Sequence, residues 1–418
     1  MAGRRVAVTG LSVISPLSCN VQTAFKAACE GKSGIKKLDS TEVPDYEKLR
    51  VKIGGKTPAD FDAAYWLKES SHARNEVNSF SLAITSDALK DGQWKITDEA
   101  LADRFGGAYG IERASMQCVN RAQKAIMEVG YGKIERFVAL KAIVHIATGS
   151  ASINNRMRGP TNTIVMDSCS GAGAIGEVFH MLKGNEIDIG FAGAADGNLY
   201  PLFMASFDNA GLLNRDSNDA PEQASRPFDQ GAKGLVFSDG GGGVLLETFD
   251  HAEERGIDIK AELVSFARVN ELGPWDGASP DGDGTYRAIL GALKKANVRP
   301  EQVDLVSAAG FSLASFDKSE ATGIKRAFGS HSPAITSISG NVGHLKAGSG
   351  AAQSVFAVLS LQTGLIPPVL NLKNPIAEAS GLDFVTGSTR KKDLEYALVL
   401  NKGFGGFNTA LLFKKVEA

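Results

Sequence analysis

The stretch of sequence that decides the fold reads Ile-Val-Met-Asp-Ser-Cys-Ser-Gly-Ala-Gly and occupies residues 164–173. An apolar strand breaks here into small residues and then runs into a helix, which is the pattern of a nucleophile elbow. A cysteine held at such a turn points towards the N-terminus of the helix, whose partial positive charge favours the thiolate and lowers the thiol pKa. Cys169 is therefore a candidate nucleophile, and the alternative on this local pattern is a buried structural cysteine.

Composition favours a large α/β protein. The 418 residues are 43% hydrophobic, which is enough for a substantial core, and the net charge of −2 gives no reason to expect a nucleic-acid or membrane partner. Residues 1–19 are too short and too interrupted for a signal peptide or a membrane span. The four cysteines form no C-x-x-C pair and have no metal-ligand spacing to histidine. We therefore predict a cytoplasmic protein without a metal site.

Strand and helix signals alternate along the chain. Segments 188–194 and 304–308 have the composition of buried strands, and helical stretches such as 286–296 separate such segments. This alternation indicates a mixed or parallel sheet covered by helices.

The chain also repeats itself loosely. Residues 163–184 and 334–364 each contain a strand, a small-residue loop and a helix that is apolar almost all round, so both helices are expected to be buried. Two similar halves that face each other would bring Cys169 and His344 towards one site.

The nucleophile stretch also matches a dinucleotide-binding pattern. Gly171, Gly173 and Gly176 give G-x-G-x-x-G after a strand and before a helix, and Asp196 follows the next strand. Against this hypothesis, Ser-Cys-Ser at 168–170 separates the strand from the first glycine, where a dinucleotide fold needs the tight turn at once. The hypothesis stays open on the sequence alone.

Six blocks spread over nearly the whole chain carry a family resemblance. They occupy residues 6–10, 157–160, 224–229, 239–247, 342–345 and 403–408. Through them the chain resembles the condensing enzymes of the thiolase fold, in the branch of the elongation β-ketoacyl-acyl-carrier-protein synthases. The resemblance implies a five-layered αβαβα fold with internal duplication. It also implies an N-terminal half, residues 1–254, with the nucleophile elbow, and a C-terminal half, residues 255–418, with the histidine loop and a glycine-rich gate loop.

The resemblance implies an acyl-transfer chemistry. Cys169 matches the nucleophile that takes an acyl chain from a carrier protein. His344 matches the second of two histidines that help to decarboxylate a malonyl thioester and to stabilise the negative charge that develops. No cofactor is implied beyond the phosphopantetheine that the acyl carrier protein supplies, and no metal is implied.

The glycine-rich loop is formed by Gly403, Phe404, Gly405 and Gly406. Phe404 aligns with the gating phenylalanine of the family, and the flanking glycines allow the loop to move. Phe407, which follows the glycine pair, resembles the type II polyketide synthases more than the housekeeping fatty-acid enzymes, which usually place threonine there.

Several positions depart from the family pattern. Where active members carry His-Gly-Thr-x-Thr, this chain has Ala309, Phe311 and Leu313 in place of the first histidine and of both threonines that hold the phosphopantetheine arm. Ser339 aligns with a lysine that helps to order the site, whereas Glu320 matches the acidic residue of that region. Loss of the first catalytic histidine predicts that condensation by this chain is impaired.

This combination resembles the chain-length factor of type II polyketide synthases, a degenerate homologue that forms a heterodimer with an intact ketosynthase. We therefore predict a subunit of this kind, in a polyketide or fatty-acid synthase, with the intact ketosynthase and an acyl carrier protein as partners. One discrepancy is that such subunits commonly replace the nucleophile, whereas Cys169 is retained. An active 3-oxoacyl-acyl-carrier-protein synthase or acyltransferase that uses Cys169 and His344 is the alternative. A thiolase is disfavoured because no cysteine follows Cys169.

Overall fold

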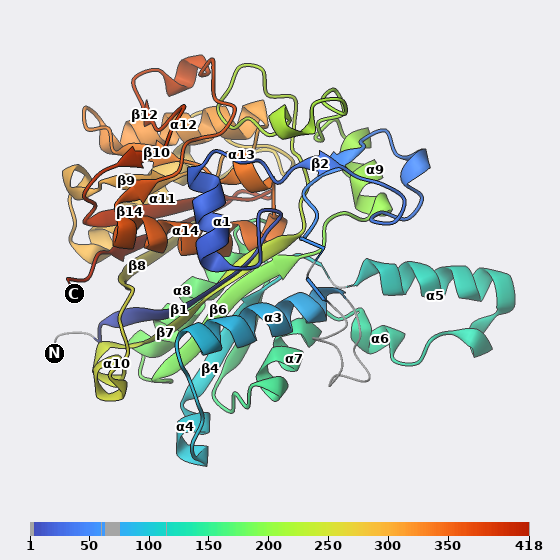
Figure 1. Ribbon diagram of the computed structural model, residues 1–418, viewed down its shortest axis with the longest axis horizontal. Coiled ribbons are helices and arrows are strands. Elements are labelled where there is room, and N and C mark those ends of the chain that lie inside the picture. Colours follow the sequence, from blue (N-terminus) through green and yellow to red (C-terminus); the bar gives the residue numbers. More distant parts are fainter. Residues whose placement is uncertain (1–3, 60, 63–75, 114, 418) are drawn as a thin grey trace.

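The computed structural model describes residues 4–59, 61–62, 76–113 and 115–417 (Figure 1). Within these residues, eleven strands form one continuous mixed sheet in the order β12-β10-β9-β14-β15-β8-β1-β7-β6-β4-β5. The two halves of this sheet have the same internal order and the same strand directions.

The first half of the sheet has the order β1-β7-β6-β4-β5. Its strands are β1 (Val6–Ile14), β7 (Gly240–Thr248), β6 (Ile189–Asp196), β4 (Phe105–Gly110) and β5 (Thr161–Ile164). The first two pairings are antiparallel and the last two are parallel. Parallel pairing requires a crossover, and the crossovers of this half carry its helices.

The second half repeats this plan. Its strands are β8 (Ala261–Asn270), β15 (Phe407–Lys414), β14 (Tyr396–Lys402), β9 (Leu305–Ser307) and β10 (Ala334–Thr336), with β12 (Asp383–Phe384) added at the edge. Again two antiparallel pairings are followed by parallel ones. A short antiparallel pairing of β1 with β8 joins the halves. The internal duplication is confirmed, and the division at residue 254 stays a proposal.

Two helices form the layer between the halves. They are α8 (Ser170–Lys183), which follows β5, and α14 (Ser349–Thr363), which follows β10. Each contacts strands of both halves, and the two contact each other. On the outer faces lie α3 (Glu76–Asp91) and α7 (Ile146–Asn154) for the first half, and α11 (Asp283–Ala296) and α12 (Ala314–Phe328) for the second (Figure 1). The layers therefore follow the predicted αβαβα order.

The remaining elements lie around these layers. The helices are α1 (Val21–Cys29), α4 (Glu99–Asp103), α5 (Met116–Val129), α6 (Val138–Lys141), α9 (Pro201–Asn209), α10 (Phe249–Arg255) and α13 (Ser339–Val342). Two small two-stranded antiparallel sheets pair β2 (Lys36–Lys37) with β3 (Ile53–Gly54), and β11 (Leu365–Ile366) with β13 (Arg390–Lys391). The α5 and α6 segment projects from the first half (Figure 1). Of the helices that the structure describes, none combines the length and the apolar character needed to cross a bilayer.

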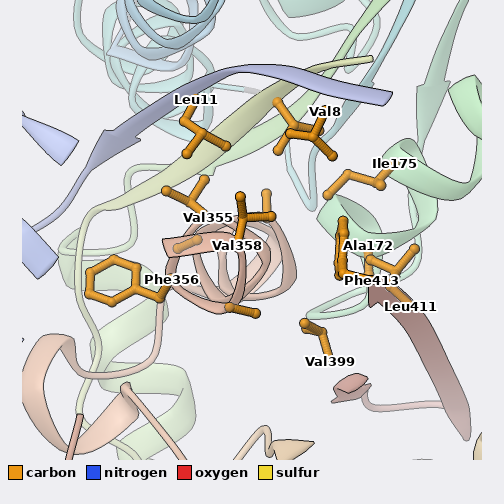
Figure 2. Packing of buried hydrophobic residues seen from close by; sticks show 14 of the residues in the cluster. Val8, Leu11, Ala172, Ile175, Val355, Phe356, Val358, Val399, Leu411 and Phe413 are labelled. Atoms are coloured by element: carbon orange, nitrogen blue, oxygen red, sulfur yellow. The ribbon is translucent and has the colours of Figure 1, made fainter. Parts of the chain in front are cut away.

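The core between the halves depends on small residues in α8. Figure 2 shows Ala172 and Ile175 of this helix together with Val355 and Val358 of α14. A side chain at Gly176 would place its Cβ only 2.2 Å from the Phe266 ring. The glycine spacing of α8 therefore serves close packing inside the protein.

This packing overturns the dinucleotide hypothesis. The first helical residue of α8 is Ser170, so Gly171 lies inside the helix and not in a turn before it. A Cβ on Gly171 would lie 2.8 Å from the Ala347 carbonyl oxygen, which leaves no room for a pyrophosphate.

We predict that Gly176→Ala lowers the thermal unfolding midpoint, because overpacking a filled core costs about 1–3 kcal/mol. The matched control is Gly149→Ala on α7, where an added Cβ meets nothing within 4 Å. There the better helix propensity of alanine raises stability by up to about 1 kcal/mol. Scanning fluorimetry of both variants checks this, and equal midpoints for the two would contradict the packing described for α8.

Candidate active site

Cys169 lies at the turn between β5 and α8, where it is the N-cap residue of the helix. Two hydrogen bonds of the Ser170 hydroxyl shape this turn: it accepts from the Met166 amide at 2.8 Å and donates to the Asp167 carbonyl at 2.7 Å. Asp167 takes a left-handed backbone with φ of 49°. The strand, sharp turn and helix that the sequence predicts are therefore present.

The predicted lowering of the Cys169 pKa is wrong. The residue is completely buried, and this burial raises the pKa of its thiol well above the ordinary value. The Thr409 hydroxyl and the Lys402 ammonium act in the opposite direction without cancelling the shift. The thiol Sγ instead donates to the Phe407 carbonyl at 3.6 Å. Loss of solvent outweighs the Thr409 hydroxyl and the Lys402 ammonium, so the neutral thiol is the stable form.

His344 is brought to the same turn, as the sequence predicts, but it pairs with a different residue. Its Nε2 lies 3.0 Å from the Ser168 hydroxyl oxygen, and no hydrogen bond joins it to Cys169 in the described part of the chain. Burial, together with the positive charge of Lys346, lowers the pKa of His344 to about 3. The imidazole is therefore neutral at physiological pH.

The positions that depart from the family pattern lie around this histidine. The Phe311 ring packs against the His344 ring with centroids 4.6 Å apart, and on its other side it stacks on Phe316 at 4.5 Å. The backbone amides of Ala309 and Gly310 donate to the Glu320 carboxylate at 2.8 and 3.0 Å. Glu320 therefore supports the loop that carries Ala309.

The shortened side chains leave very little space. A cavity of about 10 Å³ lies between Ala309, Ser339, His344, Ser168 and Lys402. This volume accommodates about one water molecule. Replacement of larger side chains by Ala309 and Ser339 therefore does not open a channel for a substrate arm.

The gate loop closes the site from the other side. Phe404 packs edge-on against Phe316 and Phe207, with centroids 5.0 and 5.8 Å apart, and Leu313 packs against the same apolar cluster. The Phe404 amide donates to Asp167 at 2.9 Å.

Hydrogen bonds of Gly405 and Gly406 join the gate loop to the segment after β8. The Gly405 amide donates to the Trp275 carbonyl, and the Gly406 carbonyl accepts from the Glu271 amide, both at 2.8 Å. Gly405 and Gly406 have φ of 80° and 84°, a conformation that favours glycine. Together with the Gly403 amide, which donates to the Phe407 carbonyl at 2.9 Å, these bonds fix the conformation of the loop.

A buried lysine that the sequence analysis did not single out lies beneath this loop. Lys346 is completely buried, and its Nζ lies 2.7 Å from Asp167 Oδ1 and 3.3 Å from Glu112 Oε1. Burial acts to raise the pKa of Asp167, but Lys346 outweighs it and lowers that pKa to about 2. The sequence signal was a lone lysine two residues after His344, in a stretch of otherwise small and apolar residues.

Lys402 is a second buried lysine beside the cavity. Its Nζ donates to Asn408 Oδ1 at 2.9 Å and lies 3.2 Å from a Glu271 carboxylate oxygen. Although Ser339 carries no charge, the site therefore contains two cations, each already paired with a carboxylate. No group of side chains in residues 4–59, 61–62, 76–113 and 115–417 is arranged to hold a metal ion.

Comparison with known proteins identifies the family. A family model described as the β-ketoacyl synthase N-terminal domain matches residues 3–252, and one described as the C-terminal domain matches residues 261–373. The chain is 34% identical to a 3-oxoacyl-[acyl-carrier-protein] synthase 2 of Vibrio harveyi, with all of both proteins covered. It is 31% identical to a mitochondrial 3-oxoacyl-[acyl-carrier-protein] synthase of Arabidopsis thaliana, covering 99% of this chain and 94% of the relative. The chain belongs to the β-ketoacyl synthase family.

Solved structures agree with this assignment and confirm the thiolase-like fold. A β-ketoacyl synthase from Burkholderia phymatum matches with a TM-score of 0.90 and 26% identity over 99% of this chain and all of that one. A second match comes from the structure of a type II polyketide synthase acyl-carrier protein in complex with its ketosynthase, which is bound to the hexaketide. Its TM-score is 0.89 and its identity is 25%, over 99% of this chain and all of that one. The ishigamide ketosynthase/chain length factor, at 22% identity and a TM-score of 0.87 over the whole of both chains, shows the fold alone.

We predict that the alkylation rate of Cys169 by iodoacetamide rises about tenfold per pH unit from pH 6 to 9 without a plateau. The reason is that only the thiolate reacts, and below a raised pKa its fraction grows with pH in this way. Peptide mapping by mass spectrometry measures the rate, with half-buried Cys29 as the internal control. A plateau below pH 7 would show an activated thiolate and contradict the neutral thiol.

Lys346→Met is expected to destabilise the protein by about 3–5 kcal/mol, because it leaves Asp167 buried without its cation. Adding Asp167→Asn is expected to restore part of the loss. The control is Lys48→Met, which removes an exposed ion pair with Asp45 and is expected to leave the stability nearly unchanged. Urea unfolding measures all variants, and equal losses for Lys346→Met and Lys48→Met would contradict the role of the buried pair.

Proposed function

We propose that this chain is a chain-length-factor-type subunit of a type II polyketide or fatty-acid synthase. In this proposal it pairs with an intact ketosynthase, and the partner carries out the condensation on chains bound to an acyl carrier protein. The observation that carries the proposal is the packing of Phe311 against His344 beside a cavity with room for about one water molecule. A catalytic site for this reaction would have to admit a phosphopantetheine thioester at that place.

The protonation state and the contacts of Cys169 support the same proposal. Cys169 is buried as a neutral thiol, and His344 contacts Ser168 in its place. Acid and base groups contribute roughly 10²–10⁴ to turnover, and one oxyanion donor contributes about 10²–10³. Ala309 stands in place of the first histidine, and among the described residues no base is hydrogen-bonded to the thiol, so condensation loses both kinds of contribution.

A partner subunit is supported by an exposed edge of the sheet. Strand β5 is the end of the sheet order and pairs only with β4 among the described strands. Beside it, Ile153 on α7 is 83% exposed and Val165 is 50% exposed. An uncovered strand edge flanked by apolar side chains is typical of a subunit interface.

The acyl carrier protein is proposed as the second partner. The description of one similar structure places such a carrier in complex with its ketosynthase. A cytoplasmic location stays a prediction from cysteine usage, and two of the similar relatives are named as mitochondrial.

An active 3-oxoacyl-acyl-carrier-protein synthase or acyltransferase is the second candidate. It is favoured by the retention of Cys169 and His344 and by full-length relatives that bear the synthase name. Under this alternative the gate loop and Phe311 would have to move before substrate enters. The two candidates differ in what the isolated chain does with malonyl-acyl-carrier protein.

We expect no release of carbon dioxide from malonyl-acyl-carrier protein by the folded chain alone. Release is expected when the chain is co-expressed and co-purified with an intact ketosynthase of the same genome, each such ketosynthase being tested in turn. Radiolabelled carbon dioxide is the readout, and the Cys169→Ala, His344→Ala double variant is the background control.

Two results would overturn the proposal. One is release by the chain alone well above the double variant, which would support the active synthase. The other is that no intact ketosynthase of the same genome forms a stable heterodimer with the chain on size exclusion.

A further inference from the structure

Three side chains at the nucleophile turn form a continuous hydrogen-bonded series. Asp167 Oδ2 lies 2.9 Å from the Ser168 hydroxyl oxygen, which in turn lies 3.0 Å from His344 Nε2. We infer that Asp167 and Ser168 are positioning residues that hold His344 in the tautomer with hydrogen on Nε2, so that this histidine is a hydrogen-bond donor and not a base. The inference concerns this chain alone and does not depend on the proposed heterodimer.

The first step of the argument counts hydrogens. A serine hydroxyl has one hydrogen to donate and two lone pairs that accept, and an ionised carboxylate can only accept. Asp167 is ionised, because Lys346 holds its pKa at about 2. The bond between Asp167 and Ser168 therefore uses the hydroxyl hydrogen. Ser168 can then only accept from His344, whose Nε2 must carry the hydrogen.

The opposite arrangement is less stable. If Ser168 donated to His344, its oxygen would face the Asp167 carboxylate at 2.9 Å with no hydrogen between them. Ser168 is only 1% exposed, so solvent does not relieve this repulsion. A hydrogen bond to an ionised group is also roughly twice as strong as one between neutral groups. The hydroxyl hydrogen therefore lies towards Asp167.

The tautomer decides what His344 can do. A neutral imidazole with hydrogen on Nε2 offers that hydrogen to negative charge, such as the oxygen of a thioester carbonyl or of an enolate. It cannot take a proton through Nε2 from the nearby Cys169 thiol, because that nitrogen has no free lone pair. The arrangement is thus suited to an oxyanion and unsuited to activating the cysteine.

The gate loop shares the same carboxylate oxygen. Asp167 Oδ2 accepts from the Phe404 amide as well as from Ser168, both at 2.9 Å. Asp167 Oδ1 is occupied by Lys346 at 2.7 Å. The gate loop and the buried lysine therefore hold the Asp167 carboxylate in place, and this carboxylate orients the Ser168 hydroxyl. The tautomer of His344 thus depends on the nucleophile turn, the gate loop and the loop that carries Lys346.

The test is the ¹⁵N chemical shifts of the full chain labelled at histidine, with His344 assigned by its loss in His344→Ala. In the unmodified protein near pH 7.5 we expect a pyrrole-type shift for Nε2 and a pyridine-type shift for Nδ1. Removal of the acceptor in Ser168→Ala is expected to move both shifts towards intermediate values, because the two tautomers then interconvert. Ser168→Thr restores a hydroxyl and is expected to restore the original pattern.

Cys169→Ala is the control and is expected to leave the histidine shifts unchanged, since no hydrogen bond joins Cys169 to His344 among the described residues. A pyridine-type chemical shift for Nε2 in the unmodified protein would overturn the inference, and this measurement does not require any variant to fold. An unchanged pattern in folded Ser168→Ala would overturn it as well. Neither result depends on a partner ketosynthase or on carbon dioxide release.

Discussion

The ion pair between Lys346 and Asp167 is the interaction on which the site depends. Lys346 lies two residues after His344, Asp167 lies two residues before Cys169, and the Asp167 carboxylate also accepts from the gate-loop amide of Phe404. Both partners have left-handed backbones, with φ of 50° and 49°. Such strain persists only where the surroundings determine the conformation, and it gathers at functional sites. One buried pair thus joins three loops that lie far apart in the sequence.

The same pair explains why the cysteine is not activated. A buried thiolate needs a nearby cation or solvent, and Cys169 is completely buried. The two buried lysines are already committed, Lys346 to Asp167 and Glu112, and Lys402 to Glu271. The charges at the site therefore stabilise its loops. The Phe311 ring packs against His344 beside the small cavity.

The alternating strand and helix signals predicted a mixed or parallel sheet covered by helices. The five layers with internal duplication were implied by the resemblance to the condensing enzymes, and the similar segments around Cys169 and His344 agreed with it. The same glycines that suggested a nucleotide pattern turned out to serve helix packing, since Gly171 and Gly176 face Ala347 and Phe266. Local sequence does not reveal such contacts, which form between residues far apart in the chain.

The location of the site could be predicted from the sequence, but the pKa values and hydrogen-bond partners of its residues could not. The positions of Cys169, His344, Ala309 and Phe311 followed from motifs. The raised thiol pKa did not, because the burial that raises it is a property of the whole fold. The pairing of Ser168 with His344 was missed for a similar reason, since 176 positions separate the two residues.

The most direct test of the central claim is product formation by the reconstituted complex when one cysteine at a time is replaced. The proposed complex is assembled from this chain and an intact ketosynthase of the same genome, and 3-oxoacyl-acyl-carrier protein is measured by mass spectrometry. The account predicts that Cys169→Ala leaves most of the product, whereas replacing the nucleophilic cysteine of the ketosynthase abolishes it. Loss of product in Cys169→Ala, with the complex intact, would contradict the account and make this chain a catalytic subunit.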